Sequence, residues 1–279
     1  MEQLTTALCV PVRGQLNETK GVHGLFNDYF MGKVYIADSL PTSESENFFR
    51  KLYGRRLKYL SMEGSFILNQ LNSMWKEASE DIVIYTHNDV YLYGDWETQV
   101  KDAFANPEVG FVAAIGMRGT LAGGGRLDIM SNMLEAEVHG RRSTKEEFIT
   151  HGDGFFLAFR RKALFDVGGF DDKDYVRFHG WDRNIAMQMI EAGFKGKYVP
   201  ISCHHRSGVT ACGNEYQNAV NEIRGISEGG DKLDHDHNMY EVFNKKWGDK
   251  LPIMVDEEGN LMEGPSQWGD FKNWHKKND

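Results

Sequence analysis

Short apolar runs separated by helical segments are the feature of this sequence that most restricts its fold. The runs lie at 7–12, 34–37, 81–85, 110–115, 154–159 and 198–203, and the first two are closed by Arg13-Gly14 and by Asp38-Ser39-Leu40-Pro41. Runs of this length with such ends are typical of buried strands. Between them, Ile67, Leu71, Met74 and Ala78 recur at helical spacing. Strands that alternate with helices predict an α/β fold with a mainly parallel central sheet and flanking helices.

Composition removes several classes of protein. Of the 279 residues, 41% are hydrophobic, which excludes disorder for most of the chain. No apolar stretch approaches the roughly 18 to 20 residues that cross a bilayer, and the N-terminus lacks the pattern of a leader, so we expect a cytoplasmic protein without a membrane span. The three cysteines argue against a disulfide scaffold. A formal net charge of −9 argues against broad, nonspecific nucleic-acid binding.

The chain is expected to consist of a main domain, residues 1–212, and a C-terminal extension, residues 213–279. Apolar density falls after about Gly213, and a helix is predicted from about Asn238 to Trp247. Within the main domain, the segment 117–151 has few long apolar runs and contains three consecutive glycines. We interpret it as a long excursion that forms a flap over the ligand-binding edge of the sheet.

Polar side chains follow three of the predicted strands directly. Arg13 follows the first strand, Asp38 the second, and His87-Asn88-Asp89 the third. Because open α/β sheets bind ligands at the carboxyl ends of their strands, these residues are expected to face one site. A turn or helix cap explains a single Asp at a strand end equally well.

A pair of imidazoles, His204 and His205, ends the last predicted strand. Alternation along a strand sends the two rings to opposite sides, so only one is expected to bind a ligand. One imidazole and one carboxylate, completed by water and phosphate oxygens, suit Mg²⁺ or Mn²⁺. Cys203 leaves a zinc site as an alternative, although no CxxC pair exists to complete it. Residues 234–237 are interpreted as a solvated loop.

Asp182 immediately precedes an apolar-faced helix predicted at 183–192. It could cap that helix, or it could act as a general base. The positive end of a helix favours the ionised carboxylate, which is the form that accepts a proton.

Several segments occur in a defined order along the first 210 residues or so. They are Val10-Pro11-Val12-Arg13, Ile36-Ala37-Asp38-Ser39, Asn72 with Ala78 and Asp89 at fixed spacing, the stretch 153–171 that ends in Gly168-Gly169-Phe170-Asp171, Trp181-Asp182 and His204-His205. Together they resemble the family 2 nucleotide-sugar glycosyltransferases of the GT-A fold. The sequence departs from that pattern where His87 replaces the first Asp of Asp-x-Asp and where Trp181 replaces the first residue of an acidic pair.

The resemblance implies a metal-dependent, inverting transferase that moves a sugar from a nucleotide sugar, by preference a UDP-sugar, to an acceptor hydroxyl. It assigns Mn²⁺ or Mg²⁺ to Asp89 and His204, with His205 as the alternate ligand, and the role of general base to Asp182. The nucleotide contacts that it implies are Pro11, Val12, Arg13, Asp38, Asn72, His87 and Asn88. The residues that it places on the acceptor side are Gly152, Asp153, Gly154 and Trp181.

Two other functions stay open at this point. The acceptor is expected to be a saccharide, but it could be a hydroxymethylated base in DNA, as in phage enzymes. The basic segments 55–58, 141–142 and 160–162 would then form a local track for phosphates. The replacements at His87 and Trp181 also leave open a noncatalytic protein that binds a sugar nucleotide or a glycan.

Overall fold

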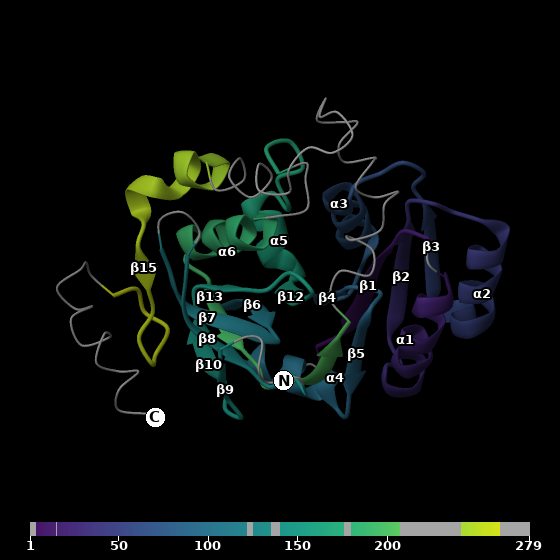
Figure 1. Cartoon of the computed structure of the whole chain (residues 1–279), viewed down its shortest axis with the longest axis horizontal. Helices are drawn as coiled ribbons and strands as arrows, with labels where there is room; N and C mark the ends of the chain where they lie inside the picture. Colours follow the sequence, from purple (N-terminus) through teal and green to yellow (C-terminus); the bar gives the residue numbers. More distant parts are fainter. Residues whose placement is uncertain are drawn as a thin grey trace.

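An eight-stranded sheet forms the centre of the computed structural model, which describes residues 4–14, 16–121, 125–134, 140–175, 180–206 and 241–262 (Figure 1). Its strand order is β10-β13-β6-β12-β4-β1-β2-β3. The strands are β1 (Thr6–Val12), β2 (Lys33–Asp38), β3 (Leu57–Ser61), β4 (Ile82–Thr86), β6 (Val109–Ala113), β10 (Glu147–Ile149), β12 (Phe156–Arg160) and β13 (Lys195–Tyr198). Only β10 and β12 run against the others, so the expected mainly parallel sheet is confirmed.

Helices cover both faces of this sheet. They are α1 (Leu16–Tyr29), α2 (Ser43–Tyr53), α3 (Ile67–Glu77), α4 (Trp96–Ala103), α5 (Arg161–Val167) and α6 (Trp181–Glu191). On one face, Phe26 of α1, Phe49 of α2 and Trp96 of α4 are buried in one apolar core. On the other face, α3, α5 and α6 contribute to a second core that includes Trp75 and Ile185. The protein is therefore an α/β structure with a layer of helices on each side of the sheet.

A second, five-stranded sheet stands beside the first. It contains β7 (Ile115–Thr120), β8 (Arg126–Ser131), β9 (Arg141–Arg142), β11 (His151–Gly152) and β15 (Ile253–Met254). Most of the segment interpreted as a flap is thus a set of paired strands. The strand predicted at 110–115 divides at Ala114 between β6 of the first sheet and β7 of the second. The closing role expected of the segment stays a prediction.

A separate two-stranded pair, β5 (Val90–Tyr93) with β14 (Ser202–His205), lies at the ends of the central strands. The sequence predicted one strand at 198–203, but β13 ends at Tyr198 and β14 begins at Ser202. Pro200 lies between them, and a proline has no N–H to donate to a ladder. The chain leaves the large sheet there and pairs with β5.

Between residues 39 and 95, three elements were not predicted from the sequence: α2, β3 and β5. Helix α2 nevertheless carries a local start signal, because the Thr42 side chain accepts a hydrogen bond from the Ser45 N–H while Ser45 Oγ accepts one from the Thr42 N–H. This is a capping box, formed with Ser in the place usually taken by Glu or Gln. A short 3-10 turn, η1 (Gly54–Arg56), connects α2 to β3.

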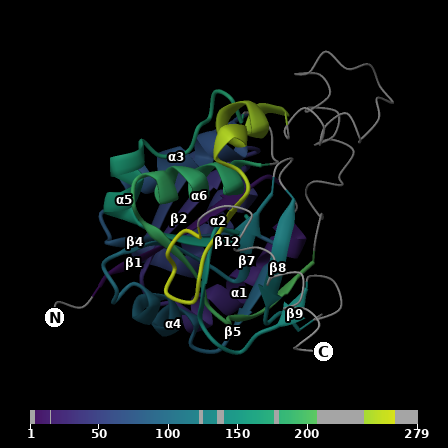
Figure 2. The same ribbon diagram turned by 90° about the vertical axis from the view of Figure 1, so that its left-hand side faces the viewer.

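The C-terminal segment packs against the main domain. Residues 241–247 are helical, and they lead through η3 (Gly248–Lys250) into β15, which pairs with β7. A helical extension is compatible with this arrangement, although the segment also adds a strand to the second sheet. Figure 2 shows it running along α6. The expected domain boundary at 212 and 213 lies outside the described residues.

Candidate functional site

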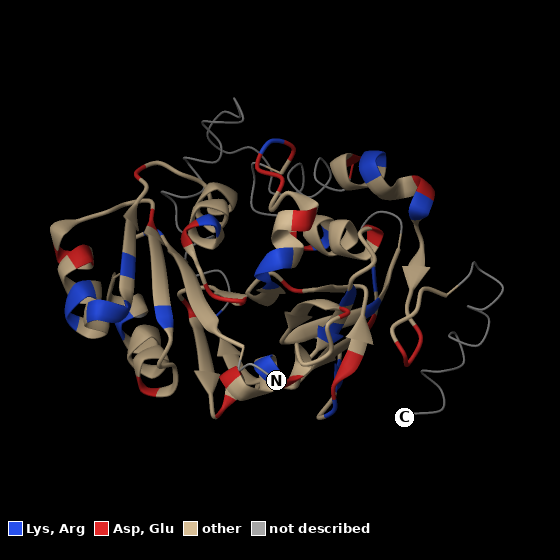
Figure 3. Ribbon diagram, turned by 180° about the vertical axis from the view of Figure 1, so that it is seen from behind, with Lys and Arg blue, Asp and Glu red and all other residues tan. Residues whose placement is uncertain are grey.

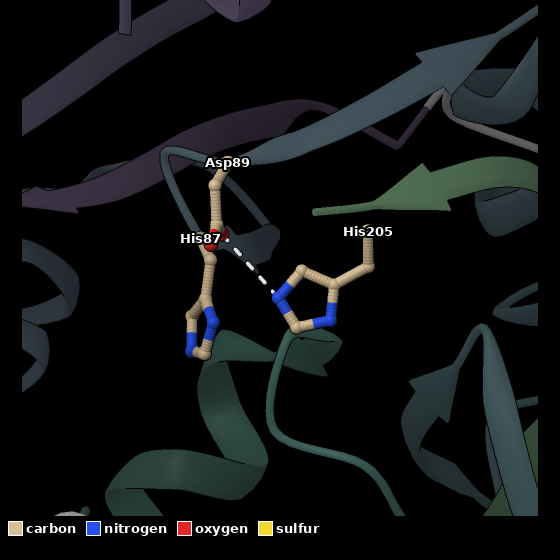
Figure 4. Close-up of side chains that lie close together, drawn as sticks. All are labelled: His87, Asp89 and His205. Atoms are coloured by element: carbon tan, nitrogen blue, oxygen red, sulfur yellow. Dashed lines mark ion pairs between the residues drawn. The ribbon is translucent and has the colours of Figure 1, made fainter. Parts of the chain in front are cut away.

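Two imidazoles and a carboxylate converge at the carboxyl end of β4. His87 and Asp89 belong to the turn between β4 and β5, and His205 is the last residue of β14. One ligand atom from each of the three side chains lies within 4.8 Å of the other two (Figure 4). His205 Nε2 is 3.3 Å from Asp89 Oδ1. This cluster is the candidate metal site.

The pairing of β5 with β14 brings these residues together. The two strands are antiparallel, with His205 opposite Val90 and His204 opposite Tyr91. The Arg206 N–H also donates to the Asp89 carbonyl oxygen at 3.1 Å. His205 therefore lies beside Asp89, whereas the ring of His204 lies 5.7 Å from that of Tyr91. We accordingly take His205, the alternate in the sequence analysis, as the candidate ligand in place of His204.

Phe155 supports both imidazoles. Its ring stacks on His205 with centroids 4.8 Å apart, and its carbonyl oxygen accepts a hydrogen bond of 2.9 Å from the His87 N–H. The two imidazole rings meet edge to face at 5.6 Å. Phe155, which directly precedes β12, therefore orients both imidazoles, His205 through its ring and His87 through its backbone.

The chemistry of the cluster fits a divalent cation. Burial lowers the pKa of His87 to about 4, which keeps its imidazole neutral near pH 7, as a metal ligand must be. Burial opposes ionisation of Asp89, but contact with His205 and the proximity of His87 hold its pKa below the ordinary value. Neither Asp89 Oδ1 nor His205 Nε2 has a hydrogen-bond partner of good geometry within the described part of the chain. Buried polar atoms of this kind are rare unless they bind something.

Asp182 lies in the first turn of α6, but it does not cap the helix. The N-cap is Gly180, whose backbone is left-handed at φ 81°, and whose carbonyl oxygen accepts from the Asn184 N–H at 3.0 Å. Asp182 Oδ1 accepts a hydrogen bond of 2.8 Å from the Arg183 N–H. Burial raises the pKa of Asp182, Arg183 opposes that shift and Asp153 adds to it. A carboxylate with a raised pKa is a stronger base than an exposed one.

Asp153 connects the two parts of the site electrostatically. Its charge acts on His87 in the metal cluster and on Asp182 in α6. Its carboxylate forms an ion pair of 3.6 Å with Arg126 at the start of β8. The turn that carries Asp153 is therefore close to both the candidate metal site and the candidate base.

Trp181 packs closely against the turn that carries Asp153, and Gly152 and Gly154 make the close packing of this turn possible. The Trp181 side chain is only 4% exposed, and it packs edge to face on Phe170 at 5.5 Å. A Cβ on Gly154 would approach the Trp181 ring to 2.7 Å, and one on Gly152 would approach the Ala113 Cβ to 2.2 Å. Trp181, which was expected on the acceptor side, is thus a core residue that shapes the turn from behind.

Two predicted nucleotide contacts are occupied within the protein. Asp38 is fully buried, and its carboxylate accepts from Ser45 Oγ at 2.9 Å, Tyr59 Oη at 2.8 Å and the Leu40 N–H at 3.0 Å. These bonds join the end of β2 to α2 and β3. A carboxylate bound in this way stabilises the fold, and a contact of Asp38 with the nucleotide stays a prediction.

The Asn72 side chain is likewise bound to partners within the protein, and its contact with the nucleotide stays a prediction. Its Nδ2 donates to the Phe170 carbonyl at 2.8 Å and to Asp172 at 3.2 Å. Its Oδ1 accepts from Trp75 Nε1 and from the Phe170 N–H, both at 3.0 Å. The side-chain amide therefore joins α3 to the loop after α5.

The remaining predicted nucleotide residues lie near the ends of β1 and β4. Pro11 and Val12 are buried in β1, where they pair with Ala37 and Asp38. Arg13 follows the strand, half-buried, and its Nη1 donates to Ser39 Oγ at 3.4 Å. Asn88 Nδ2 donates to Thr19 Oγ1 of α1 at 3.2 Å. Of these residues, Arg13 is the one with a charged group at the edge where a nucleotide is expected.

Three polar residues near the base were not singled out from the sequence: Arg126, Arg183 and His151. Arg126 pairs with Asp153, and Arg183 is buried beside Asp182. The pKa of His151 is lowered mainly by burial, and the charges of Arg183 and Arg126 lower it further. The positions of Arg126 and His151 depend on the pairing of β7 with β8 and β11, whereas Arg183 lies in α6. Of the three, only His151 carried a signal in the sequence, because it directly precedes the predicted Gly152-Asp153-Gly154 turn.

The basic segments 141–142 and 160–162 each contain an arginine that is bound within the protein. Arg141 is bound to Asp128 and Glu147, and Arg160 donates to the carbonyl oxygens of Phe104 and Asn106. Basic and acidic residues are interspersed over the elements (Figure 3). These guanidinium groups stabilise the fold through partners in the protein.

Comparison with known proteins finds likeness in structure alone. No protein-family model matches the sequence, and no curated protein matches it. A mannosyltransferase from Pyrobaculum calidifontis, solved with GDP-Man and Mn²⁺, has a TM-score of 0.55 and 16% identity over 87% of this chain and 70% of that one. GalNAc-T7, solved with UDP, GalNAc and Mn²⁺, has a TM-score of 0.57 and 14% identity over 90% of this chain and 56% of its own.

A third solved structure, residues 1–349 of S. aureus TarS with UDP-GlcNAc, has a TM-score of 0.54 and 12% identity over 88% of this chain and 73% of that one. Together these likenesses show that the chain has the fold of the GT-A glycosyltransferases. Within the part that the structure describes, no helix combines the length and apolar character needed to cross a membrane.

Proposed function

We propose that this protein is a metal-dependent glycosyltransferase that moves a sugar from a nucleotide sugar to an acceptor hydroxyl, with inversion at the anomeric carbon. The observation that supports this most is the buried cluster of His87, Asp89 and His205 at the carboxyl end of β4, in a chain with the GT-A fold. Asp182 adds a carboxylate with a raised pKa, and the charge of Asp153 acts on both parts.

The donor binds along the ends of β1 and β4 in this proposal. Arg13 supplies a positive charge at the end of β1, and the metal cluster lies at the end of β4. Two of the similar structures were solved with UDP or a UDP-sugar and one with a GDP-sugar. A UDP-sugar is our preferred donor, and the test below includes both nucleotides.

His87, Asp89 and His205 would hold the cation. When bound, Mn²⁺ would stabilise the negative charge that builds on the departing diphosphate. Because imidazole is a poor ligand for Mg²⁺, two imidazoles and one carboxylate favour Mn²⁺ over Mg²⁺. His87 thus moves from the nucleotide contacts to the metal ligands.

Asp182 would accept the proton of the acceptor hydroxyl as the oxygen attacks the anomeric carbon. Desolvation makes its carboxylate a better base than an exposed one. The attack comes from the side opposite the leaving diphosphate, and this single displacement inverts the configuration. Asp153, beside Asp182 and bound to Arg126, would form part of the acceptor side.

A saccharide is the preferred acceptor. DNA would need a surplus of positive charge along one surface. The net charge is −9, and Arg141 and Arg160 are engaged by partners within the protein. These observations favour a neutral hydroxyl-bearing acceptor over a duplex.

The experiment that tests the proposal is incubation of the purified protein with a panel of UDP- and GDP-sugars, Mn²⁺ and saccharide acceptors. Released nucleotide identifies the donor, mass spectrometry identifies the product, and NMR of the anomeric proton identifies the configuration. A retained configuration would refute the inverting mechanism. Binding of nucleotide sugar without turnover of any donor, with saccharides and hydroxymethylated DNA both supplied, would indicate a noncatalytic binding protein.

A further inference from the structure

We infer that the C-terminal segment 241–255 positions the candidate base, and that Trp247 is its principal positioning residue. The segment contacts both α6, which carries Asp182, and β7, which pairs with the strand leading to Asp153. The inference rests on the proposed role of Asp182, and it goes beyond that role by assigning a function to a segment remote in the sequence.

The first contact is a buried hydrogen bond to α6. Trp247 Nε1 donates to Asn184 Oδ1 at 2.9 Å, and Asn184 lies two positions after Asp182 in the sequence. The Asn184 N–H donates to the carbonyl oxygen of Gly180, the N-cap, and its Nδ2 donates to Gln188 Oε1 at 3.0 Å. The Trp247 hydrogen bond therefore reaches the first turn of the helix through one side chain.

Apolar packing and ion pairs extend this contact along α6. Phe243 and Trp247 form a small buried cluster with Met187, a residue of α6. Lys246 pairs with Asp171, ahead of α6, at 3.0 Å, and Lys250 pairs with Glu191, the last residue of α6. Partners before, within and at the end of the helix restrict both its rotation and its translation.

The second contact is with β7. Ile253 and Met254 pair with Thr120 and Gly119, and the Val255 N–H donates to the Arg118 carbonyl oxygen at 3.1 Å. β8 pairs with one edge of β7 along the whole stretch from Ile115 to Thr120. β15 and β11 must therefore follow each other along the opposite edge.

β11 continues directly into the turn that holds Asp153. Gly152 pairs with Gly116 of β7, and the Asp153 N–H donates to the Ile115 carbonyl oxygen at 3.2 Å. One segment thus connects the helix with Asp182 to the strand that supports Asp153. The candidate metal ligands come from the β4–β5 turn and β14, which none of these contacts involve.

This division predicts a selective effect on turnover. A small displacement of a reacting group can lower the rate of a chemical step by about a hundredfold, whereas donor binding depends on other elements. Loosening the segment should therefore lower kcat and leave the KM for the nucleotide sugar unchanged. A general loss of stability would not separate the two constants.

The test compares Trp247→Phe, Asn184→Ala and the double variant with Trp96→Phe as the matched control. Trp247→Phe keeps an aromatic ring but removes the indole donor and part of the side-chain volume. Trp96→Phe removes the same volume from an equally buried site, in α4 on the opposite face of the sheet. Both single variants should lower kcat by about ten- to a hundredfold with KM for the donor within about twofold. The double variant should lose less than the product of the two single losses, because both changes remove the hydrogen bond between Trp247 and Asn184, which counts only once.

Hydrogen–deuterium exchange gives a readout that does not depend on activity. Amides of 181–187 should exchange faster in Trp247→Phe than in the wild type, and at the wild-type rate in Trp96→Phe. A Trp247→Phe enzyme with kcat within about twofold of the wild type, or a loss of kcat equal to that of Trp96→Phe, would overturn the inference. If the wild type transfers no sugar from any donor, the proposed function fails. Unchanged exchange of the 181–187 amides in Trp247→Phe would refute the positioning role independently of activity.

Discussion

Nε2 of His205 lies 3.3 Å from Oδ1 of Asp89, at the end of two paired strands that come from distant parts of the chain. Neither atom has a hydrogen-bond partner of good geometry among the residues described, and His87 completes the group. A protein gains little from burying three such groups together unless a cation compensates for their desolvation. This relationship is the basis for the first prediction.

His205→Ala should lower Mn²⁺ affinity and turnover by at least tenfold, because one of three protein ligands is lost. His204→Ala is the matched control, since the His204 ring lies beside Tyr91 and should leave both quantities near wild type. Isothermal titration with Mn²⁺ and initial rates measure the two effects. An inactive His204→Ala beside an active His205→Ala would reverse the assignment of the imidazoles.

The identity of the ion is a second prediction. After treatment with EDTA, Mn²⁺ should restore activity well above the level that Mg²⁺ restores at the same concentration, because two of the three ligands are imidazoles. Rates measured across a titration of each ion test this. Equal rates with saturating Mg²⁺ would show that the imidazoles do not bind the ion.

Asp182→Asn should retain binding of Mn²⁺ and nucleotide sugar but lower kcat by about 10²- to 10⁴-fold, the usual contribution of a general base. The amide cannot accept the proton of the acceptor hydroxyl. Asp166→Asn, an exposed carboxylate paired with Lys162 on α5, is the control and should be unaffected. Near-normal kcat in Asp182→Asn would remove this residue from the role of base.

The pH dependence of turnover should report the raised pKa of Asp182. Because the base must be ionised, kcat should fall as pH falls through that pKa, at a higher pH than for an ordinary carboxyl group. Rates measured at saturating donor and Mn²⁺ test this. An acid limb centred at the ordinary value of about 4 would show that Asp182 is not desolvated in the active enzyme.

The same shift has a consequence for stability. A carboxyl group with a raised pKa in the folded state stabilises the fold below its unfolded pKa, and that contribution is lost as pH rises through the folded pKa. Asp182→Asn does not titrate, so its melting temperature should exceed that of the wild type increasingly as pH rises. Thermal unfolding from pH 4 to 8 measures the difference. A constant difference would contradict the raised pKa.

His23 should contribute to acid unfolding. It is buried between α1 and α2, its Nδ1 lies 2.6 Å from Tyr53 Oη, and burial lowers its pKa to about 3. The neutral imidazole contributes its full share to the free energy of unfolding above the unfolded pKa of about 6.5. That contribution is lost as pH falls toward 3, and the total loss is about 5 kcal/mol. His23→Gln should show a flatter loss of unfolding free energy between pH 6.5 and 4 in urea titrations. Parallel curves would contradict this.

Local patterns predicted most of the fold. The apolar spacing of Leu71 and Met74 predicted α3, and runs such as Ile82–Thr86 predicted the central strands, because both signals reside in neighbouring residues. Helix α2 was missed although Thr42 and Ser45 cap it, since its start signal uses Ser where Glu is usual. The second sheet was not predicted, and two of its pairs, β11 with β7 and β15 with β7, join segments far apart in the sequence.

The site divides in the same way. Asp89 and Asp182 could be proposed because a polar residue at a strand end or helix start is visible in the sequence itself. Asp38 and Asn72 stand at comparable positions, yet their hydrogen bonds are all made within the protein, and only the partners Ser45, Tyr59 and Phe170 reveal it. Position along the chain does not show whether a polar group is already satisfied.

The sequence by itself determined the α/β class, the strand ends that carry polar groups and the presence of a histidine pair. Only the tertiary structure decided which histidine meets Asp89, because the register of β14 on β5 sets which ring faces the β4 turn. It also decided that the C-terminal segment joins α6 through Trp247 and Asn184. Side-chain periodicity is a local property, whereas strand register and contacts between distant segments follow from the packing of the whole chain.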